Sequence, residues 1–229
     1  KMPDFVFAPP PPVTVPVTDG RLFPVRRIFC VGRNYAAHAR EMGNDPTREP
    51  PFFFTKPADA LVPAGQDTPY PSQTKNLHHE IELVVAIGTG GQEISPAQAL
   101  SHVFGYSIGI DLTRRDLQDE AKGLRRPWDL SKGFDASAPI GAIAPASAVG
   151  HPAAGRIALS VNGQIRQEGD LADQIWPVPD IIATLSRFVA LAPGDLIFTG
   201  TPEGVAAIVK GDKLVGEIAG IGTLYTKIV

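Results

Sequence analysis

The sequence predicts a β-rich α+β fold with a few helices, and three observations support this class. The 229 residues include 23 Gly and 23 Pro, which is typical of many turns and short elements rather than long helices. Few segments have a sustained helical period, whereas several short runs are rich in β-branched residues. With 43% hydrophobic residues, the chain can bury one full core.

The expected organisation is an N-terminal arm followed by one domain. Residues 1–20 hold Pro9-Pro10-Pro11-Pro12 and Pro16, a composition typical of an extended, polyproline-like segment. No repeat or low-complexity linker divides residues 21–229. We therefore expect residues 1–20 to form a proline-rich arm and residues 21–229 to fold as a unit.

Eight strands are expected from runs of β-branched and aromatic residues that lie between turn signals. They cover residues 23–31, 51–56, 79–87, 103–110, 157–161, 164–167, 195–198 and 222–228. Gly32-Arg33-Asn34 ends the first strand, and Pro57 ends the second. Asn162-Gly163 separates two of the later strands, and this dipeptide predicts a tight hairpin.

Four helices are expected between these strands, over residues 35–42, 95–102, 111–122 and 175–191. Asn34 and Ser95 are candidate N-caps of the first two, and Gly43 would end the first. The last segment has the clearest amphipathic period.

Composition and charge argue against several classes of protein. The net charge is -3 without any basic tract, so nucleic acid is not an expected partner. No apolar stretch reaches the length of a membrane span, and no signal peptide is visible, so a cytoplasmic protein is expected. Cys30 is the single cysteine, which excludes an intrachain disulfide and suggests a core position.

Glu80 and Glu82 are the most informative residues of the chain. They are two residues apart at the start of an apolar segment, so a strand would direct both side chains to one face, about 7 Å apart. Two like charges on a partly buried strand are costly unless a cation lies between them. Taken alone, they could also be ordinary acids on the solvent face of an amphipathic strand.

Asp111 adds a third carboxylate at the end of the next apolar segment. By itself, it could equally cap the helix that is expected to follow. Three carboxylate ligands with water completing the shell would suit Mg²⁺ or Mn²⁺ rather than Zn²⁺.

His38 and Glu41 are three residues apart, so they would share one face of the first expected helix. A carboxylate beside an imidazole can hold one tautomer and raise its basicity, and such a pair can activate water. The alternative is an exposed helical pair without a chemical role.

Four further side chains could contact a ligand. Arg115 and Gln118 lie one helical turn apart shortly after Asp111, where they could bind a carboxylate or simply lie on a helix surface. Lys132 lies between apolar neighbours and could turn inward or reach solvent. Thr201 lies in a glycine-flanked loop that allows close approach of the backbone to a ligand.

Six segments in this order resemble the fumarylacetoacetate hydrolase family over most of residues 21–229. They are Gly32-Arg33-Asn34-Tyr35 with His38 and Glu41, Phe54-Thr55-Lys56-Pro57, His79-Glu80-Ile81-Glu82, Asp111 with Arg115 and Gln118, Lys132-Gly133-Phe134-Asp135, and Thr199-Gly200-Thr201-Pro202-Glu203-Gly204-Val205.

The resemblance implies a mixed β-sandwich or β-roll in a homodimeric enzyme, with residues 21–229 as the catalytic domain. It implies that Glu80, Glu82 and Asp111 bind Mg²⁺ or Mn²⁺. His38 and Glu41 match the water-activating dyad of the family, and Lys132 matches its active-site lysine. Arg115, Gln118 and Thr201 match positions that contact substrate, and Arg33 and Tyr35 of the first motif are also expected to bind it.

Within the family, residues 22–28, 48–54 and 126–130 resemble the members that cleave fumarylpyruvate in gentisate breakdown. The expected reaction is hydrolysis of the C–C bond of a 2,4-dioxo acid, in which His38 deprotonates the attacking water and Lys132 offsets developing charge. The distal carboxylate of such a substrate needs a cation, and Arg33 and Arg125 are both candidates.

Other activities use the same scaffold and stay open at this stage. They are a broader acylpyruvate hydrolase, an oxaloacetate decarboxylase, and an isomerase or decarboxylase of homoprotocatechuate breakdown. Decarboxylation needs no attacking water, so the His38–Glu41 pair favours hydrolysis. A non-catalytic metal- or ligand-binding protein is the alternative from another class, and its signature would be the loss of one of these residues.

Overall fold

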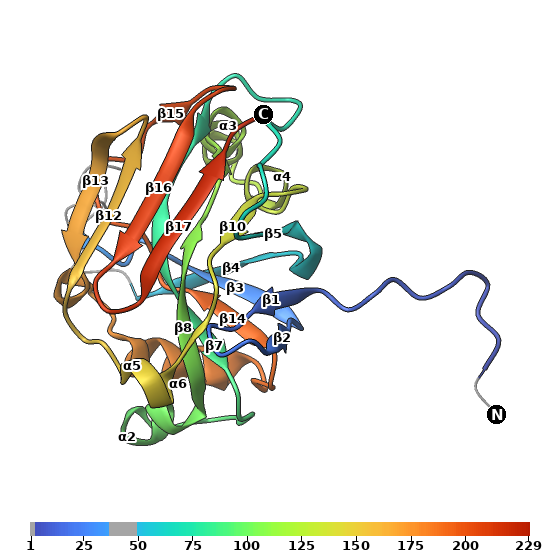
Figure 1. Cartoon of the computed structure of the whole chain (residues 1–229), viewed down its shortest axis with the longest axis vertical. Helices are drawn as coiled ribbons and strands as arrows, with labels where there is room; N and C mark the ends of the chain where they lie inside the picture. Colours follow the sequence, from blue (N-terminus) through green and yellow to red (C-terminus); the bar gives the residue numbers. More distant parts are fainter. Residues whose placement is uncertain (1–2, 37–49) are drawn as a thin grey trace.

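The computed structural model describes residues 3–36 and 50–229, and its centre is one large mixed sheet (Figure 1). In spatial order its strands are β4 (Phe52–Lys56), β3 (Arg27–Gly32), β14 (Asp195–Phe198), β7 (Ile81–Ile87), β8 (Val103–Ile110), β10 (Ala138–Ile140) and β5 (Leu61–Pro63), with β11 (Ala144–Pro145) beside β8. Two pairs, β14 with β3 and β10 with β5, are parallel, and the other pairs are antiparallel.

Three smaller sheets surround it. A four-stranded antiparallel sheet has the order β13 (Gln164–Asp170), β12 (Arg156–Val161), β16 (Lys213–Ile218) and β17 (Gly222–Lys227). Short strands β15 (Ala207–Ile208), β6 (Leu77–His78) and β9 (Thr113–Arg114) form another, and β1 (Thr14–Pro16) pairs with β2 (Leu22–Pro24).

The helices are short, as expected from the glycine and proline content. They are η1 (Ala58–Ala60), α2 (Pro96–Ala99), η2 (Leu100–His102), α3 (Arg115–Gly123), α4 (Asp129–Lys132), α5 (Ala146–Val149), η3 (Leu171–Asp173) and α6 (Val178–Phe188). The β-rich α+β class predicted from the sequence is confirmed. Among the described residues, no helix combines the length and the apolar character needed to cross a membrane.

Strand β7 separates two hydrophobic clusters, because its side chains alternate between the two faces of the large sheet. Leu83 and Val85 pack into the core between the large sheet and the four-stranded sheet. Val84 and Ala86 face a second cluster that includes Cys30 and residues of β1 and β2. The expectation of a half-buried strand is therefore wrong, since all seven residues of β7 are buried.

The element boundaries show where local sequence signals were sufficient. The Asn162-Gly163 hairpin is confirmed, with φ of 52° and 82° at the two loop residues, as a tight primed turn requires. The strand expected over 23–31 is divided into β2 and β3, and the helix expected from residue 111 begins at Arg115 after the short β9. Strands β5, β10 and β16 have weak signals and were not predicted.

Candidate active site

The three predicted metal ligands come together at one end of the β7–β8 pair. Ile81 pairs with Ile110, and the Asp111 N–H donates to the Glu80 carbonyl at 2.8 Å, so Asp111 lies opposite Glu80. Glu82 shares the face of Glu80 because the two are separated by one residue of extended chain. The register of one antiparallel pair therefore assembles all three carboxylates.

These carboxylates form a buried cluster of oxygen donors. One oxygen from each of Glu80, Glu82 and Asp111 lies within 4.8 Å of the other two, and all three side chains are buried. Glu82 also accepts a hydrogen bond from the Gly200 N–H at 2.9 Å. Burial, followed by the neighbouring Asp111 and Glu80, raises the pKa of the Glu82 carboxyl well above its usual range.

Two buried lysines balance part of this negative charge. Lys132, at the end of α4, donates to Glu80 Oε2 at 2.9 Å, to Asp111 Oδ2 at 2.8 Å and to Thr113 Oγ1 at 2.7 Å. Burial opposes its charge, but Asp111 and Glu80 together raise the pKa of Lys132 above its ordinary value. Lys56, on β4, lies 2.8 Å from Asp111 Oδ1.

Arg115 and Gln118 are buried on one face of α3, as their spacing predicted. The Arg115 guanidinium lies 2.5 Å from Glu80 Oε1, and it donates to Gln118 Oε1 at 2.6 Å. It also donates to His78 Nδ1 at 3.2 Å, while His78 Nε2 faces Asn76 Oδ1 at 3.0 Å. Burial and the adjacent Arg115 lower the pKa of His78 to about 4, so a neutral imidazole accepts from the guanidinium.

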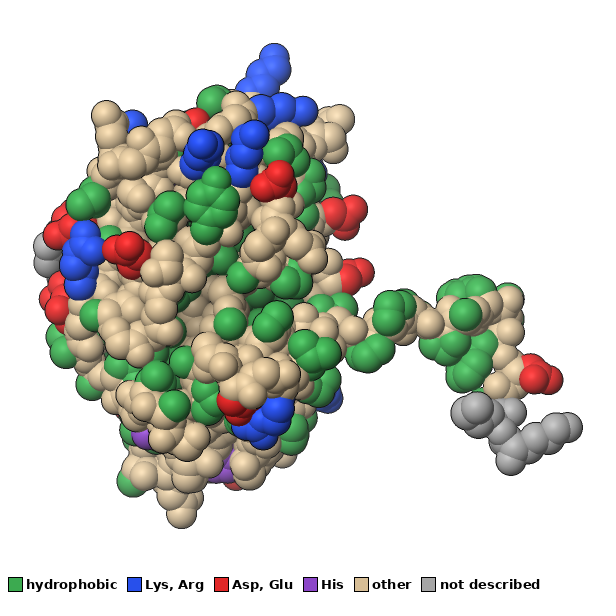
Figure 2. Space-filling view, in the orientation of Figure 1, with side chains coloured by type: hydrophobic (Ala, Val, Ile, Leu, Met, Phe, Trp, Pro, Cys, Tyr) green, Lys and Arg blue, Asp and Glu red, His purple; other side chains and the backbone are tan. Residues whose placement is uncertain are grey.

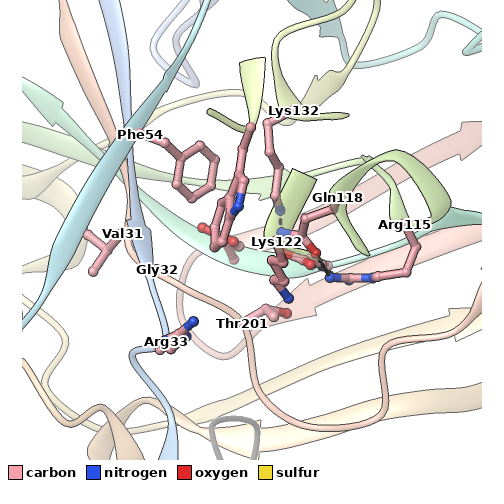
Figure 3. A pocket seen from close by; sticks show the side chains of 12 residues that line it. Val31, Gly32, Arg33, Phe54, Arg115, Gln118, Lys122, Lys132 and Thr201 are labelled. Carbon is pink, nitrogen blue, oxygen red and sulfur yellow. Dashed lines mark hydrogen bonds and ion pairs between the residues drawn. The ribbon is translucent and has the colours of Figure 1, made fainter. Parts of the chain in front are cut away.

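A pocket opens above the carboxylates and is lined by side chains from β3, β4, α3 and the loop after β14 (Figure 3). The described residues that line it are Val31, Gly32, Arg33, Phe54, Glu80, Glu82, Arg115, Gln118, Lys122, Trp128, Lys132 and Thr201. Burial, then the nearby Arg115 and Arg33, lowers the pKa of the Lys122 ammonium. The pocket thus combines a carboxylate cluster at its base with cationic groups on its walls.

The predicted site residues divide into three groups. Most of them line this pocket, namely Arg33, Glu80, Glu82, Arg115, Gln118, Lys132 and Thr201, and Asp111 belongs to the same carboxylate cluster as Glu80 and Glu82. Tyr35 is buried beside a separate pocket lined by Glu168 and Glu203. His38 and Glu41 lie outside the described residues, so the predicted dyad stays a prediction.

Four residues with direct contacts to this site were missed from the sequence: Lys56, His78, Lys122 and Gln167. Lys56 follows Phe52-Phe53-Phe54-Thr55 at a strand end, and this apolar run is a signal that its aliphatic stem can be buried. Gln167 gave no signal, because its partners are distant along the chain.

The donor set fits a divalent metal. Three buried carboxylates whose oxygens lie within 4.8 Å of one another are unfavourable without a cation between them, and their ligand atoms are all oxygen, which suits Mg²⁺ or Mn²⁺. Glu82 contacts no cationic side chain within the described part of the chain, and its raised pKa marks a carboxylate that a metal ion would stabilise in the charged form.

Comparison with known proteins gives three informative similarities. The chain is 55% identical to the crystallised fumarylpyruvate hydrolase from Pseudomonas aeruginosa in complex with Mn²⁺ and pyruvate, with 99% of both chains covered and a TM-score of 0.97. It is 46% identical to a fumarylpyruvate hydrolase from Ralstonia sp. over 79% of this chain and 93% of that one. It is also 41% identical to a mitochondrial oxaloacetate tautomerase from Rattus norvegicus, over 89% and 91% of the two chains.

Residues 27–229 match the fumarylacetoacetate (FAA) hydrolase C-terminal family. The match includes the β7–β8 carboxylates, the α3 pair, Lys132 and the Thr201 loop. The predicted β-roll type of fold and the divalent-metal cofactor class agree with these relatives. The chain is an enzyme of the fumarylacetoacetate hydrolase family.

Proposed function

We propose that this enzyme hydrolyses the C3–C4 bond of fumarylpyruvate to give fumarate and pyruvate, as a cytoplasmic step of gentisate catabolism. The observation that supports it best is a pocket with a carboxylate cluster at its base and two basic side chains, Arg33 and Lys122, on its walls. Such a pocket suits a substrate with a 2-oxo acid at one end and a second carboxylate at the other. The 55% identity to the Pseudomonas aeruginosa fumarylpyruvate hydrolase supports the same substrate.

Glu80, Glu82 and Asp111 are the proposed metal ligands. A divalent metal held there supplies a Lewis acid for the 2-oxo acid end of the substrate. Lys132, which bonds both Glu80 and Asp111, keeps a positive charge beside the reacting atoms and stabilises negative charge that develops on oxygen. Its raised pKa keeps that charge in place at neutral pH.

His38 is the proposed general base and Glu41 its orienting carboxylate. His38 takes a proton from water, and the hydroxide adds to the C4 carbonyl carbon beside the fumaroyl group. Collapse of the tetrahedral adduct breaks the C3–C4 bond, and the electron pair stays with C3. Protonation of C3 gives pyruvate, and the acyl part leaves as fumarate, so one water is consumed for each bond broken.

Arg115, Gln118 and Thr201 are the proposed contacts for the 2-oxo acid end. Arg115 and Gln118 are held against each other at 2.6 Å and line the pocket beside Glu80. Arginine at this position is suited to bind a substrate carboxylate, because its planar guanidinium can donate two parallel hydrogen bonds. Tyr35, from the Gly-Arg-Asn-Tyr motif, lines the separate pocket described above. Its contact with the substrate stays a proposal.

Lys122 and Arg33 are the proposed partners of the distal carboxylate. Both line the pocket, and they approach it from different elements, α3 and the end of β3 (Figure 3). Lys122 is partly buried and lies 5.4 Å from the Trp128 ring centroid. Arg125, the other sequence candidate, is exposed and is not among the described residues that line the pocket.

A homodimer is the proposed assembly. The arm before β1 extends away from the body of the molecule and exposes apolar side chains along its length (Figures 1 and 2). Phe5 is 62% exposed, Val6 100% and Phe7 76%, a cluster of apolar surface that is unfavourable in water. Light scattering on the full chain and on a variant lacking residues 1–12 tests this proposal. A monomeric full chain would contradict it.

One kinetic comparison tests the proposed substrate. Fumarylpyruvate, acetylpyruvate and oxaloacetate are supplied to one preparation with Mn²⁺, and loss of dioxo-acid absorbance and pyruvate formation are followed. We expect kcat/KM for fumarylpyruvate to exceed that for acetylpyruvate by at least about 100-fold, because acetylpyruvate offers no carboxylate to the distal cations. Equal values for the two acylpyruvates would contradict the assigned distal site.

Oxaloacetate tautomerisation is the second candidate activity, because of the 41% identity to the rat tautomerase. Oxaloacetate is also a dicarboxylate, and moving its proton between carbon and oxygen needs no attacking water. Enol–keto interconversion of oxaloacetate without release of pyruvate, together with no hydrolysis of fumarylpyruvate, would favour this activity over the proposed one.

A further inference from the structure

Gln167 is a buried side chain of β13 that makes four hydrogen bonds to the active-site segments. It is 1% exposed, and its Oε1 accepts from the Ile81 N–H at 3.0 Å and from His79 Nδ1 at 2.8 Å. Its Nε2 donates to Thr201 Oγ1 at 2.8 Å and to the Pro202 carbonyl at 2.9 Å. The amide thus joins the start of β7 to the loop after β14.

The orientation of this amide is fixed by its partners. A backbone N–H can only donate and a backbone carbonyl can only accept, so Oε1 must face Ile81 and Nε2 must face Pro202. Thr201 Oγ1 is therefore an acceptor toward Gln167. Its own hydroxyl hydrogen is left to donate elsewhere, and Thr201 lines the pocket.

Ile81 gives the amide a second role, because this residue lies between the candidate metal ligands Glu80 and Glu82. The bond from the Ile81 N–H to Gln167 fixes the peptide plane between them. The Gln167 amide thus bonds both the Thr201 hydroxyl and the backbone between Glu80 and Glu82. Gln167 itself is not among the described residues that line the pocket.

We propose that Gln167 is a positioning residue that makes the Thr201 hydroxyl a dedicated hydrogen-bond donor to the 2-oxo acid end of the substrate. This role rests on the proposed function through the contact between Thr201 and substrate. Without the Nε2 donor, the Thr201 hydroxyl would turn toward residue 167 and no longer donate into the pocket. In protein that still folds, this loss would weaken binding of the 2-oxo acid.

Gln167→Glu is the sharpest variant, because it replaces the NH₂ donor by an oxygen of nearly the same size. The Thr201 hydroxyl would then donate to the new carboxylate. The Mn²⁺-loaded protein is titrated with pyruvate as the probe, and KM and kcat are measured with fumarylpyruvate. We expect the pyruvate Kd and the KM to rise by about 10- to 100-fold, as for loss of a bond to a charged group, and kcat to change less.

A double-mutant cycle with Thr201→Val separates positioning from a general structural effect. If Gln167 acts through Thr201, the two single variants weaken pyruvate binding similarly, and the double variant is no weaker than either. Additive losses would overturn the proposal. So would an unchanged pyruvate Kd in Gln167→Glu.

Thr226→Val is the matched control, since Thr226 is equally buried in the same four-stranded sheet. Its hydroxyl bonds Thr68 Oγ1 at 2.7 Å and the Gln66 carbonyl at 3.1 Å, away from the pocket. This variant should lower the melting temperature and leave the pyruvate Kd unchanged. An equal rise of Kd in Thr226→Val and Gln167→Glu would overturn the proposal.

Gln167→Met serves as the second variant if the glutamate prevents folding. The pyruvate Kd and the double-mutant cycle with Thr201→Val are then measured on this variant and decide the outcome. Pyruvate binding does not depend on turnover. A wild-type enzyme that binds pyruvate but leaves fumarylpyruvate intact would therefore contradict the proposed function, while the cycle would still decide the role of Gln167.

Discussion

The Lys132 ammonium lies 2.8 Å from Asp111 Oδ2, and both side chains are almost fully removed from water. The same nitrogen lies 2.9 Å from Glu80 Oε2. Lys132 therefore bridges two of the three proposed metal ligands, Glu80 directly before β7 and Asp111 directly after β8. Its charge supports both the structure of the site and the chemistry proposed there.

Replacing Lys132 by Met should destabilise the protein and nearly abolish turnover. Removing one partner of a buried ion pair costs about 3–5 kcal/mol, because the remaining charge stays buried. Urea unfolding in the presence of EDTA measures this change. The exposed pair of Arg156 with Glu168 is the control, and Arg156→Met should change stability little. Equal effects of the two substitutions would contradict a structural role for the Lys132 bridge.

Glu82→Gln should weaken metal binding more than it weakens the fold. The amide oxygen introduced by this change can still accept the Gly200 N–H bond that Glu82 accepts at 2.9 Å, but it offers no charge to the metal. We expect the Kd for Mn²⁺ to rise by more than about 100-fold, beyond the effect typical of an outer partner. Calorimetric titration measures it, with the exposed Glu217→Gln as the control. Unchanged Mn²⁺ affinity would remove Glu82 from the ligand set.

Lys122 should give substrate binding an alkaline limit. Burial, followed by the nearby Arg115, lowers the pKa of the Lys122 ammonium from 10.5, and Arg33 adds to this lowering while Asp119 and Glu80 oppose it. The ammonium therefore loses its proton at a lower pH than an ordinary lysine. The KM for a dicarboxylate should rise as the pH increases through this lowered pKa, and it should be lowest on the acidic side.

Two variants test this pH dependence. Lys122→Arg keeps its charge and should remove the alkaline rise in KM, because a guanidinium stays protonated in that range. Lys122→Met should show a high KM at every pH. A KM profile that is identical in wild type and Lys122→Met would show that Lys122 does not bind the substrate.

His38→Ala should abolish hydrolysis and leave Mn²⁺ binding nearly intact. The imidazole is proposed to take the proton from the attacking water and not to ligate the metal, so only the chemical step depends on it. Stopped assays of pyruvate release and Mn²⁺ titration are run on the same preparation. His151→Ala is the control, because this exposed histidine bonds the Tyr106 hydroxyl and does not line the pocket. Full activity of His38→Ala would contradict the proposed role of His38 as the general base.

Gly200→Ala should be strongly destabilising. Gly200 has φ of +102°, and an added Cβ would lie 2.6 Å from Asn34 Cβ. Backbone strain and overlap together predict a loss of about 2–5 kcal/mol in the free energy of unfolding. Gly123→Ala is the control, because nothing lies within 4 Å of its added Cβ and α3 would gain a helix former. A neutral Gly200→Ala would contradict the close packing of these two segments.

The fold class and the metal cluster could be predicted because their signals are local. Runs of apolar residues identified β7 and β8, and acids at the ends of these two strands marked Glu80, Glu82 and Asp111. Asn162-Gly163 specified its own turn by the positive φ that both residues tolerate. In each case the decisive interaction lies within a few residues or one strand pair.

Other features could not be predicted because they depend on distant partners. Asn34 is a candidate helix N-cap, and most of that expected helix lies outside the described residues. Its observed partners are distant: Nδ2 donates to the Trp176 and Thr199 carbonyls, 142 and 165 residues away. The role of Gln167 depends on residues 86 and 34 positions away. Tertiary pairing therefore decides what these polar side chains do, and no local pattern carries that information.

The bond from Gly200 to Glu82, which spans 118 residues, has a consequence for how the enzyme acquires its activity. Contacts of such long sequence separation form late, because the chain between them must first be closed into a loop. A nascent chain that has completed only the β7–β8 hairpin already holds all three acids, yet it lacks the segment that positions Glu82. The proposed metal site is therefore complete only when the Gly200 segment has packed against Glu82, and we expect full metal affinity to appear with the finished fold rather than before it.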